Sequence, residues 1–192
     1  MTRELPLFPL QTVLFPGGPL DLRIFEPRYL DMVASVLRAD NRFGVVAIRS
    51  GSEVGAAETF AVGTSAEIVD WEDTGGLLAI RTLGRESFRI EDSSRRSDGL
   101  YVGRVAVLDE LPSMPLPAEH SKLATLLRTL LVQLPAYARI ATVYDDATWV
   151  GARLAEILPF AVTLKQALLE TRDPRERLER IAAGLRAEPT LA

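Results

Sequence analysis

Proline residues interrupt the apolar start of this chain and limit what it can fold into. They separate short runs of large apolar residues within 5–10, 13–20 and 25–29. Each proline fixes its own φ, lacks an N–H donor and favours extended geometry in the residue before it. Sheets tolerate such prolines at strand starts, edges and bulges rather than inside central strands. The pattern therefore predicts two short extended segments at a sheet edge, with backbone groups near Pro9 and Pro16 left available.

A turn, a third strand and a helix are expected next. The sequence Pro16-Gly17-Gly18-Pro19 predicts a tight turn because glycine reaches positive φ without steric cost. The third strand is expected at 20–24 and the helix at 26–39. Glu26 and Pro27 suit a helix start, since an acid faces the positive end of the dipole and proline loses nothing in the first turn.

Several short strands are predicted after this helix. Phe43–Ile48 is a continuous apolar run typical of a buried strand, and the glycine-containing stretch 49–57 is expected to be a loop. Two antiparallel pairs follow, the first of them closed by the turn residues 72–76. Their strands are expected at 63–71, 77–83, 86–91 and 100–108. Regular short strands with turn signals favour a barrel or sandwich.

The apolar period changes after the proline-rich stretch 111–117, which is expected to be a semi-rigid linker. Leucines at helical spacing predict helices from about residue 118 to 187. Their start signals are Asp145 or Asp146, the capping-box spacing of Thr163 with Gln166, and the sequence Asp173-Pro174. The sequence thus predicts a β half followed by a helical half.

Composition excludes several kinds of site. The 192 residues contain no cysteine and one histidine, His120, which disfavours disulfides, transition-metal sites and Cys–His catalysis. The formal net charge of −4 is unfavourable for general nucleic-acid binding. No signal peptide and no apolar run of about 18 residues is recognised, so we expect a cytoplasmic location and no membrane partner.

No catalytic site, metal site or cofactor is predicted. The chain has no phosphate-binding Gly-x-x-x-x-Gly-Lys-Ser/Thr loop. Two adjacent acid pairs, Glu72-Asp73 and Asp145-Asp146, lie at a predicted hairpin tip and a predicted helix start. Acids are favoured at both kinds of position without any catalytic role.

Several stretches, in order, resemble the Lon N-terminal, or substrate-binding, domain in its stand-alone bacterial version. They cover residues 6–29, 43–48, 62–68, 83–90, 158–160 and 165–170. The resemblance implies an α+β fold: a PUA-like antiparallel β pseudo-barrel with one inserted helix in 1–111, then a helical bundle in 118–192. The bundle is expected to pack as one unit with the barrel. The resemblance also implies binding of polypeptides, while the ATPase and Ser–Lys protease modules of full Lon are missing here.

Five residues of the opening stretch are candidates for peptide binding: Phe8, Phe15, Phe25, Arg28 and Tyr29. The aromatic side chains either fill the end of the barrel or line an apolar groove for unfolded or extended polypeptide. Arg28 beside Glu26 either forms a structural ion pair or holds a peptide carboxylate. The leading hypothesis is a non-catalytic polypeptide-binding module, an adaptor or chaperone-like factor in protein quality control.

Two alternatives come from other functional classes. The first is a PUA-like RNA-binding module, favoured by the arginines of the segment 77–104. These are Arg81, Arg85, Arg89, Arg95, Arg96 and Arg104. Acidic residues in the same segment argue against a continuous basic face, and a solvated face of mixed pairs is the simpler interpretation. The second alternative is an accessory to an ATP-dependent protease.

The purified chain is predicted neither to hydrolyse ATP nor to cleave casein-like substrates, because the groups for both reactions are missing. Phosphate release and casein cleavage, each measured against a buffer blank, check this. ATP turnover that co-purifies with the chain through successive columns would contradict it.

Overall fold

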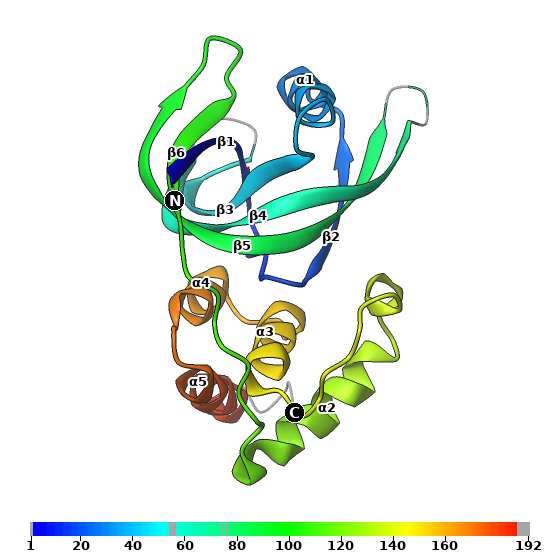
Figure 1. Ribbon diagram of the computed structural model, residues 1–192, viewed down its shortest axis with the longest axis vertical. Helices are drawn as coiled ribbons and strands as arrows, with labels where there is room; N and C mark the ends of the chain where they lie inside the picture. Colours follow the sequence, from blue (N-terminus) through cyan, green and yellow to red (C-terminus); the bar gives the residue numbers. More distant parts are fainter. Residues whose placement is uncertain (1, 54–56, 74, 76, 188–192) are drawn as a thin grey trace. The chain divides into compact units, whose positions relative to one another are not determined.

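Six strands of the first half of the chain pair into one mixed sheet (Figure 1). The computed structural model describes residues 2–53, 57–73, 75 and 77–187. The chain divides into two units, Met1–Asp109 and Glu110–Ala192. The first unit contains β1 Thr2–Leu10, β2 Pro19–Ile24, α1 Pro27–Val36, β3 Arg42–Gly51, β4 Ala57–Asp73, β5 Leu78–Arg95 and β6 Tyr101–Val107. That the two units pack as one stays a prediction.

The sheet closes on itself. Its order is β2-β5-β4-β3-β1-β6, and β6 pairs with β5 as well as with β1. Five strands thus form a ring, while β2 attaches only to β5. The strands pair antiparallel except β1 and β3, which are parallel. The sequence predicted a mostly antiparallel barrel and did not identify the one parallel pair. The long connection through β2 and α1 lets β3 return parallel to β1. The name PUA-like pseudo-barrel stays a prediction.

The observed strands are longer than the predicted ones. β5 runs unbroken through the predicted strands 77–83 and 86–91, with register shifts in its pairing to β4. Its first half pairs with β2 and its second half with β6. β3 and β4 also extend into the predicted loop 49–57, of which residues 54–56 lie outside the described part. Thr74 and Gly76 of the predicted hairpin turn are likewise outside it.

Prolines lie inside β1 although this strand has neighbours on both sides. Its first half, up to Leu7, pairs with β6, and its second half, from Leu7, pairs with β3. Pro6 lies in the first half and Pro9 in the second, so each has one side without a partner strand. The proline nitrogen, which has no hydrogen to donate, can face that side without the loss of a hydrogen bond between strands. Successive residues of a strand alternate in direction, which fits the odd spacing of the two prolines. Both prolines thus lie where β1 has a partner strand on one side only, which is the kind of position that tolerates proline.

The turn after β1 is confirmed. Gly18 N–H donates to the Phe15 carbonyl at 3.0 Å, and Gly17 has φ 76°, the geometry of a type II turn. Gly17 N–H donates to the Gly84 carbonyl and Gly84 N–H to the Gly18 carbonyl, both at 2.8 Å. The backbone near Pro16 is therefore bonded to β5 and not available to a peptide. The predicted extended segment 13–15 is buried but forms no strand.

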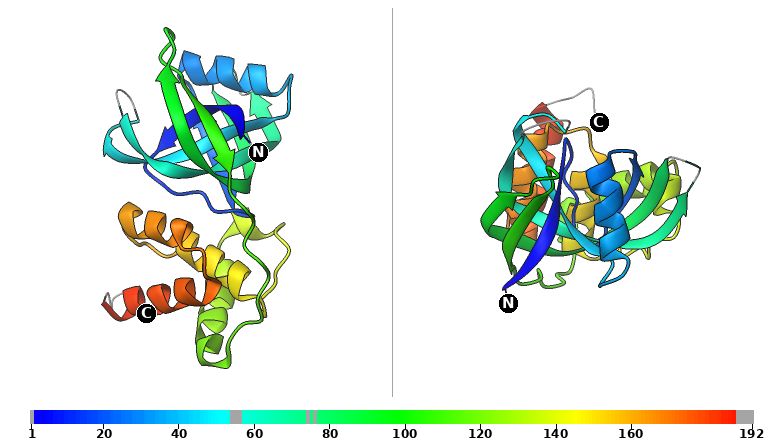
Figure 2. Two further views of the ribbon diagram at one scale, coloured as in Figure 1. Left: turned by 60° about the vertical axis from the view of Figure 1, so that its left-hand side comes forward. Right: turned by 90° about the horizontal axis from the view of Figure 1, so that it is seen from above.

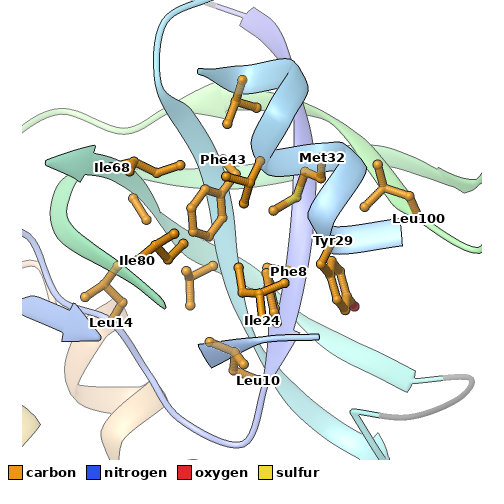
Figure 3. Close-up of a cluster of buried hydrophobic side chains, with 14 residues drawn as sticks. Phe8, Leu10, Leu14, Ile24, Tyr29, Met32, Phe43, Ile68, Ile80 and Leu100 are labelled. Atoms are coloured by element: carbon orange, nitrogen blue, oxygen red, sulfur yellow. The ribbon is translucent and has the colours of Figure 1, made fainter. Parts of the chain in front are cut away.

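Helix α1 covers one face of the sheet (Figure 2). It presents Tyr29, Met32, Val33 and Val36 to a core of fourteen buried residues. Figure 3 shows this core, in which Tyr29 and Met32 of the helix lie among strand side chains such as Phe8 and Phe43. Half-buried leucines pack against it at its border: Leu20, Leu22, Leu30, Leu37 and Leu78.

The second unit is helical, as predicted for 118–187. Its elements are η1 Ala118–His120, α2 Ser121–Leu131, η2 Pro135–Tyr137, α3 Ala147–Ile157, α4 Val162–Glu170 and α5 Pro174–Ala187. Helix α3 packs against α2, α4 and α5. Asp146 caps α3 by accepting from Trp149 N–H, and Asp173 accepts from Arg175 N–H. The prediction of a capping box that starts at Thr163 is wrong, because α4 already begins at Val162 and its N-cap residue is Ala161.

The proline-rich stretch 111–117 is bonded to the start of α3 rather than serving as a separate linker. Asp146 accepts hydrogen bonds from the Ser113 hydroxyl and the Met114 N–H. The Thr148 hydroxyl donates to the Pro112 carbonyl at 2.7 Å. The prediction of a semi-rigid linker is therefore corrected. Local composition identified the prolines but not the hydrogen bonds with Asp146 and Thr148 that hold this stretch to α3.

Replacing Asp146 by alanine is expected to lower the free energy of unfolding. Loss of the cap costs about 1 kcal/mol, and leaving the Ser113 and Met114 donors without their acceptor adds about 1–3 kcal/mol. Urea unfolding followed by circular dichroism measures this. Asp145→Ala is the matched control because its side chain is exposed. Equal midpoints for the two variants would contradict the prediction.

Candidate functional site

Three of the five predicted peptide-binding residues belong to the core. Phe8, Phe15 and Tyr29 are 8 %, 0 % and 3 % exposed. The rings of Phe8 and Tyr29 stack at 3.9 Å under α1 (Figure 3). Burial raises the pKa of Tyr29, with a smaller opposing effect of Arg28. These three aromatic side chains therefore fill the core and do not line an exposed groove.

Phe25 is exposed, at the junction between β2 and α1. Its side chain is 65 % accessible, whereas the preceding Ile24 is buried. Alternation along the strand explains the difference, because successive side chains point to opposite faces. The binding of a peptide by Phe25 stays a prediction.

Arg28 is held by groups of its own unit. Its guanidinium forms an ion pair with Glu26 at 2.7 Å and donates to the Glu53 carbonyl at 3.1 Å and the Gly99 carbonyl at 3.4 Å. It also lies over the Tyr29 ring, 4.7 Å from the centroid. These contacts tie α1 to two loops and correspond to the structural alternative for Arg28. A role in holding a peptide carboxylate stays a prediction.

A second exposed aromatic, which the sequence analysis did not single out, lies near the end of β4. Trp71 is 56 % exposed and pairs with Ile80, whose side chain is in the core. Directly opposite side chains share a face of the sheet, so Trp71 lies on the core side although most of its side chain is exposed. The available signal was an aromatic residue directly before the acids Glu72-Asp73 of the hairpin.

Half-buried leucines continue this surface across the sheet. Leu22 pairs with Ile80, and Leu78 lies two residues from Ile80 on β5. We call the set Leu20, Leu22, Trp71 and Leu78 the Trp71 surface. Its leucines pack against the main core from one side and are partly open to solvent on the other. Such a surface provides apolar area to an incoming chain without any change in the core.

A charged cluster occupies another part of the same unit. Arg42 Nη1 donates to both carboxylate oxygens of Glu86, at 2.9 and 3.0 Å, and the hydroxyl of Ser65 donates to one of them at 2.8 Å. Arg85 Nε donates to Glu67 at 2.8 Å. Partial burial of Glu86 opposes ionisation, but hydrogen bonds from its backbone N–H, Ser65 and Arg42 hold its pKa at about 2. The cluster links β3, β4 and β5.

The arginines of 77–104 lie among acids. Four of the six predicted RNA-binding arginines form ion pairs: Arg81, Arg85, Arg96 and Arg104. Their partners are carboxylates of the same unit. The arrangement corresponds to mixed pairs on a solvated face, the simpler of the two interpretations.

The described residues contain neither a metal-binding cluster nor a membrane-spanning helix. Within 2–53, 57–73, 75 and 77–187, no group of three or more His, Cys, Asp or Glu residues is arranged to hold a metal ion. In the same part of the chain, no helix is long and apolar enough to cross a membrane.

Neutralising Glu86 is expected to change how stability depends on pH. Its folded pKa of about 2 is below the ordinary 4.5, so the ionised carboxylate stabilises the fold above pH 4.5. This contribution is lost as the pH falls toward 2. The midpoint of thermal unfolding should therefore decline less between these pH values in Glu86→Gln than in the wild type. Glu91→Gln removes a carboxylate of similar exposure, 41 % against 43 %, and is the control. Parallel curves for Glu86→Gln and wild type would refute the assignment.

The fold is shared with a solved structure of a bacterial protein. The crystal structure of a Lon N-terminal domain protein from Xanthomonas campestris is 40 % identical to this chain, with a TM-score of 0.77. The match covers 94 % of this chain and 98 % of that one. The two chains thus agree over nearly their whole lengths.

Curated relatives match as parts of longer proteins. Lon protease 2 of Myxococcus xanthus is 31 % identical over 190 residues, which are 91 % of this chain and 22 % of that protein. Protein cereblon of Xenopus tropicalis is 30 % identical over 134 residues, which are 67 % of this chain and 29 % of cereblon. The chain therefore spans less than a third of either relative.

A family model accounts for almost all of the chain. The model describes the substrate-binding domain of the ATP-dependent protease La (LON), which is a non-catalytic domain, and matches residues 4–186. The mixed sheet with its helices agrees with the solved Lon N-terminal domain fold. With the sequence match and the fold in agreement, this chain belongs to the LON substrate-binding domain family.

Proposed function

We propose that this chain recognises unfolded or extended polypeptide through the Trp71 surface and catalyses no reaction of its own. The observation that carries the proposal is the 56 % exposure of Trp71 beside leucines that pack on the main core. A large aromatic fixed at the border of a packed core loses little conformational entropy on binding. The family supports polypeptide as the ligand, since its model describes a substrate-binding domain.

The Trp71 surface is suited to apolar segments that folded proteins bury. Trp71 and Leu78 lie on neighbouring strands, and Leu22 continues the surface on the third. Burying this area against an apolar side chain stabilises a complex by roughly 25 cal/mol per Å² of apolar surface removed from water. In this role the chain acts as an adaptor or chaperone-like factor in protein quality control.

The predicted aromatics contribute indirectly. Phe8 and Tyr29 stack in the core under α1, and the border of that core includes the leucines of the Trp71 surface. Phe15 is fully buried in the same unit. Truncating Phe15 should therefore cost about 3–5 kcal/mol of stability, and any loss of binding would follow from unfolding. Trp71 differs because its side chain is mostly outside the core.

Trp71→Ala is expected to weaken binding of a reduced, carboxymethylated client protein by about 1–3 kcal/mol, because aromatic anchors dominate such interfaces. The denaturation midpoint should change little, since the side chain is exposed. Fluorescence anisotropy of a labelled client measures the affinity. Val132→Ala, at an 89 % exposed apolar position of the other unit, is the control. Unchanged affinity in Trp71→Ala would overturn the proposed site.

A further inference from the structure

Among the described strands, β2 is the one with a single partner strand along its whole length. Ring closure gives β1, β3, β4, β5 and β6 partners along the sheet, whereas β2 pairs with β5 alone. An unpaired edge presents a row of N–H and C=O groups that matches one chemical partner, another extended backbone. At six residues, β2 is long enough to pair with a short segment.

Hydrogen bonds identify which groups of β2 face outward. The Gly18 carbonyl accepts from Gly84 N–H at 2.8 Å, and the Leu20 carbonyl accepts from the Thr82 hydroxyl at 2.9 Å. The residues at these alternate positions therefore direct their backbone groups toward β5. Because antiparallel pairing alternates along a strand, Asp21 and Arg23 direct their N–H and C=O groups to the open edge.

The side chains of β2 are also divided between two environments. Leu20 and Leu22 lie on the core face and stay partly open to solvent, where the sheet ends. Asp21 and Arg23 are exposed on the other face. Asp21 pairs with Arg81 at 3.4 Å, while no ion pair within the described residues involves Arg23. One face of this edge thus has leucine side chains that are partly exposed to solvent. The other face has a cation, Arg23, that forms no ion pair among the described residues.

We propose that an extended segment of the bound polypeptide adds to the open edge of β2 as a further strand. Its alternate apolar side chains lie beside Leu20 and Leu22, and it carries an acidic residue opposite Arg23. The inference rests on the proposed polypeptide binding and specifies its mode: backbone pairing supplies attachment, and the alternation of apolar and acidic residues supplies selection. Charged residues on a short edge strand limit indiscriminate pairing, so the match to Arg23 governs which segments bind.

The first test uses synthetic peptides that alternate leucine with threonine and carry one central glutamate. A series in which successive backbone nitrogens are methylated one at a time is titrated against the full chain. Strand addition requires that every second N–H donates to β2, so affinity should fall with a period of two along the peptide. Equal effects at all positions would overturn the proposal.

The second test changes the edge of β2 itself. Asp21→Pro removes an N–H that faces the open edge, whereas Asp21→Ala keeps it, and both variants lose the ion pair with Arg81. Asp21→Pro should bind the peptide several-fold more weakly than Asp21→Ala at similar thermal midpoints. Equal binding by the two folded variants would count against strand addition. If the proline variant does not fold, the methylation series alone decides.

The third test exchanges charge. Arg23→Glu should reverse the preference between the glutamate peptide and its lysine counterpart, by about twofold to fivefold for one cross-strand pair. An unchanged preference would overturn the assigned partner of Arg23. Binding that depends on Trp71 but shows neither the period nor the reversal would refute strand addition and leave the proposed function standing. No binding of any client or peptide would refute both, and dimerisation through β2 would refute the proposed occupant.

Discussion

The pairing of β6 with both β1 and β5 is the constraint on which the N-terminal unit depends. It closes five strands into a ring and so removes the free edges that an open sheet would expose. Closure also explains the unbroken β5, which has to reach from β2 at one end to β6 at the other. The strand left outside the ring is β2, which pairs with β5 alone over its whole length and therefore has an open edge next to the leucines of the Trp71 surface.

The core under α1 determines which aromatics remain for binding. A helix laid over the sheet buries Phe8 and Tyr29 in a stacked pair and leaves Phe25 outside, one residue beyond the buried Ile24. Trp71 stays 56 % exposed near the end of β4. Stability and the proposed recognition thus depend on different aromatics of one sheet, so the exposed ring can be changed with little effect on the core.

The family and the local chemistry agree on a binding module. The match over residues 4–186 and the shared fold with the Xanthomonas campestris protein identify a substrate-binding domain. The charged groups of the N-terminal unit pair with one another: Glu86 with Arg42, Arg85 with Glu67, and Arg28 with Glu26. Such pairs link neighbouring strands and helices, and the surfaces proposed to accept a chain are the apolar border of the core and the edge of β2.

The sequence by itself determined the features that depend on neighbouring residues. These are the turn at 16–19, the helical second half, the caps at Asp146 and Asp173, and the family. The turn, the helices and the caps follow from backbone preferences or bonds within a few residues, and the family follows from the order of several short stretches along the chain. The tertiary structure decided what depends on distant segments: the parallel pairing of β1 with β3, the closure by β6, the binding of 111–117 by Asp146, and the burial of Phe15 against the exposure of Trp71. Local pattern identifies an apolar side chain, but only the strands and helices that arrive from elsewhere in the chain determine whether it is covered.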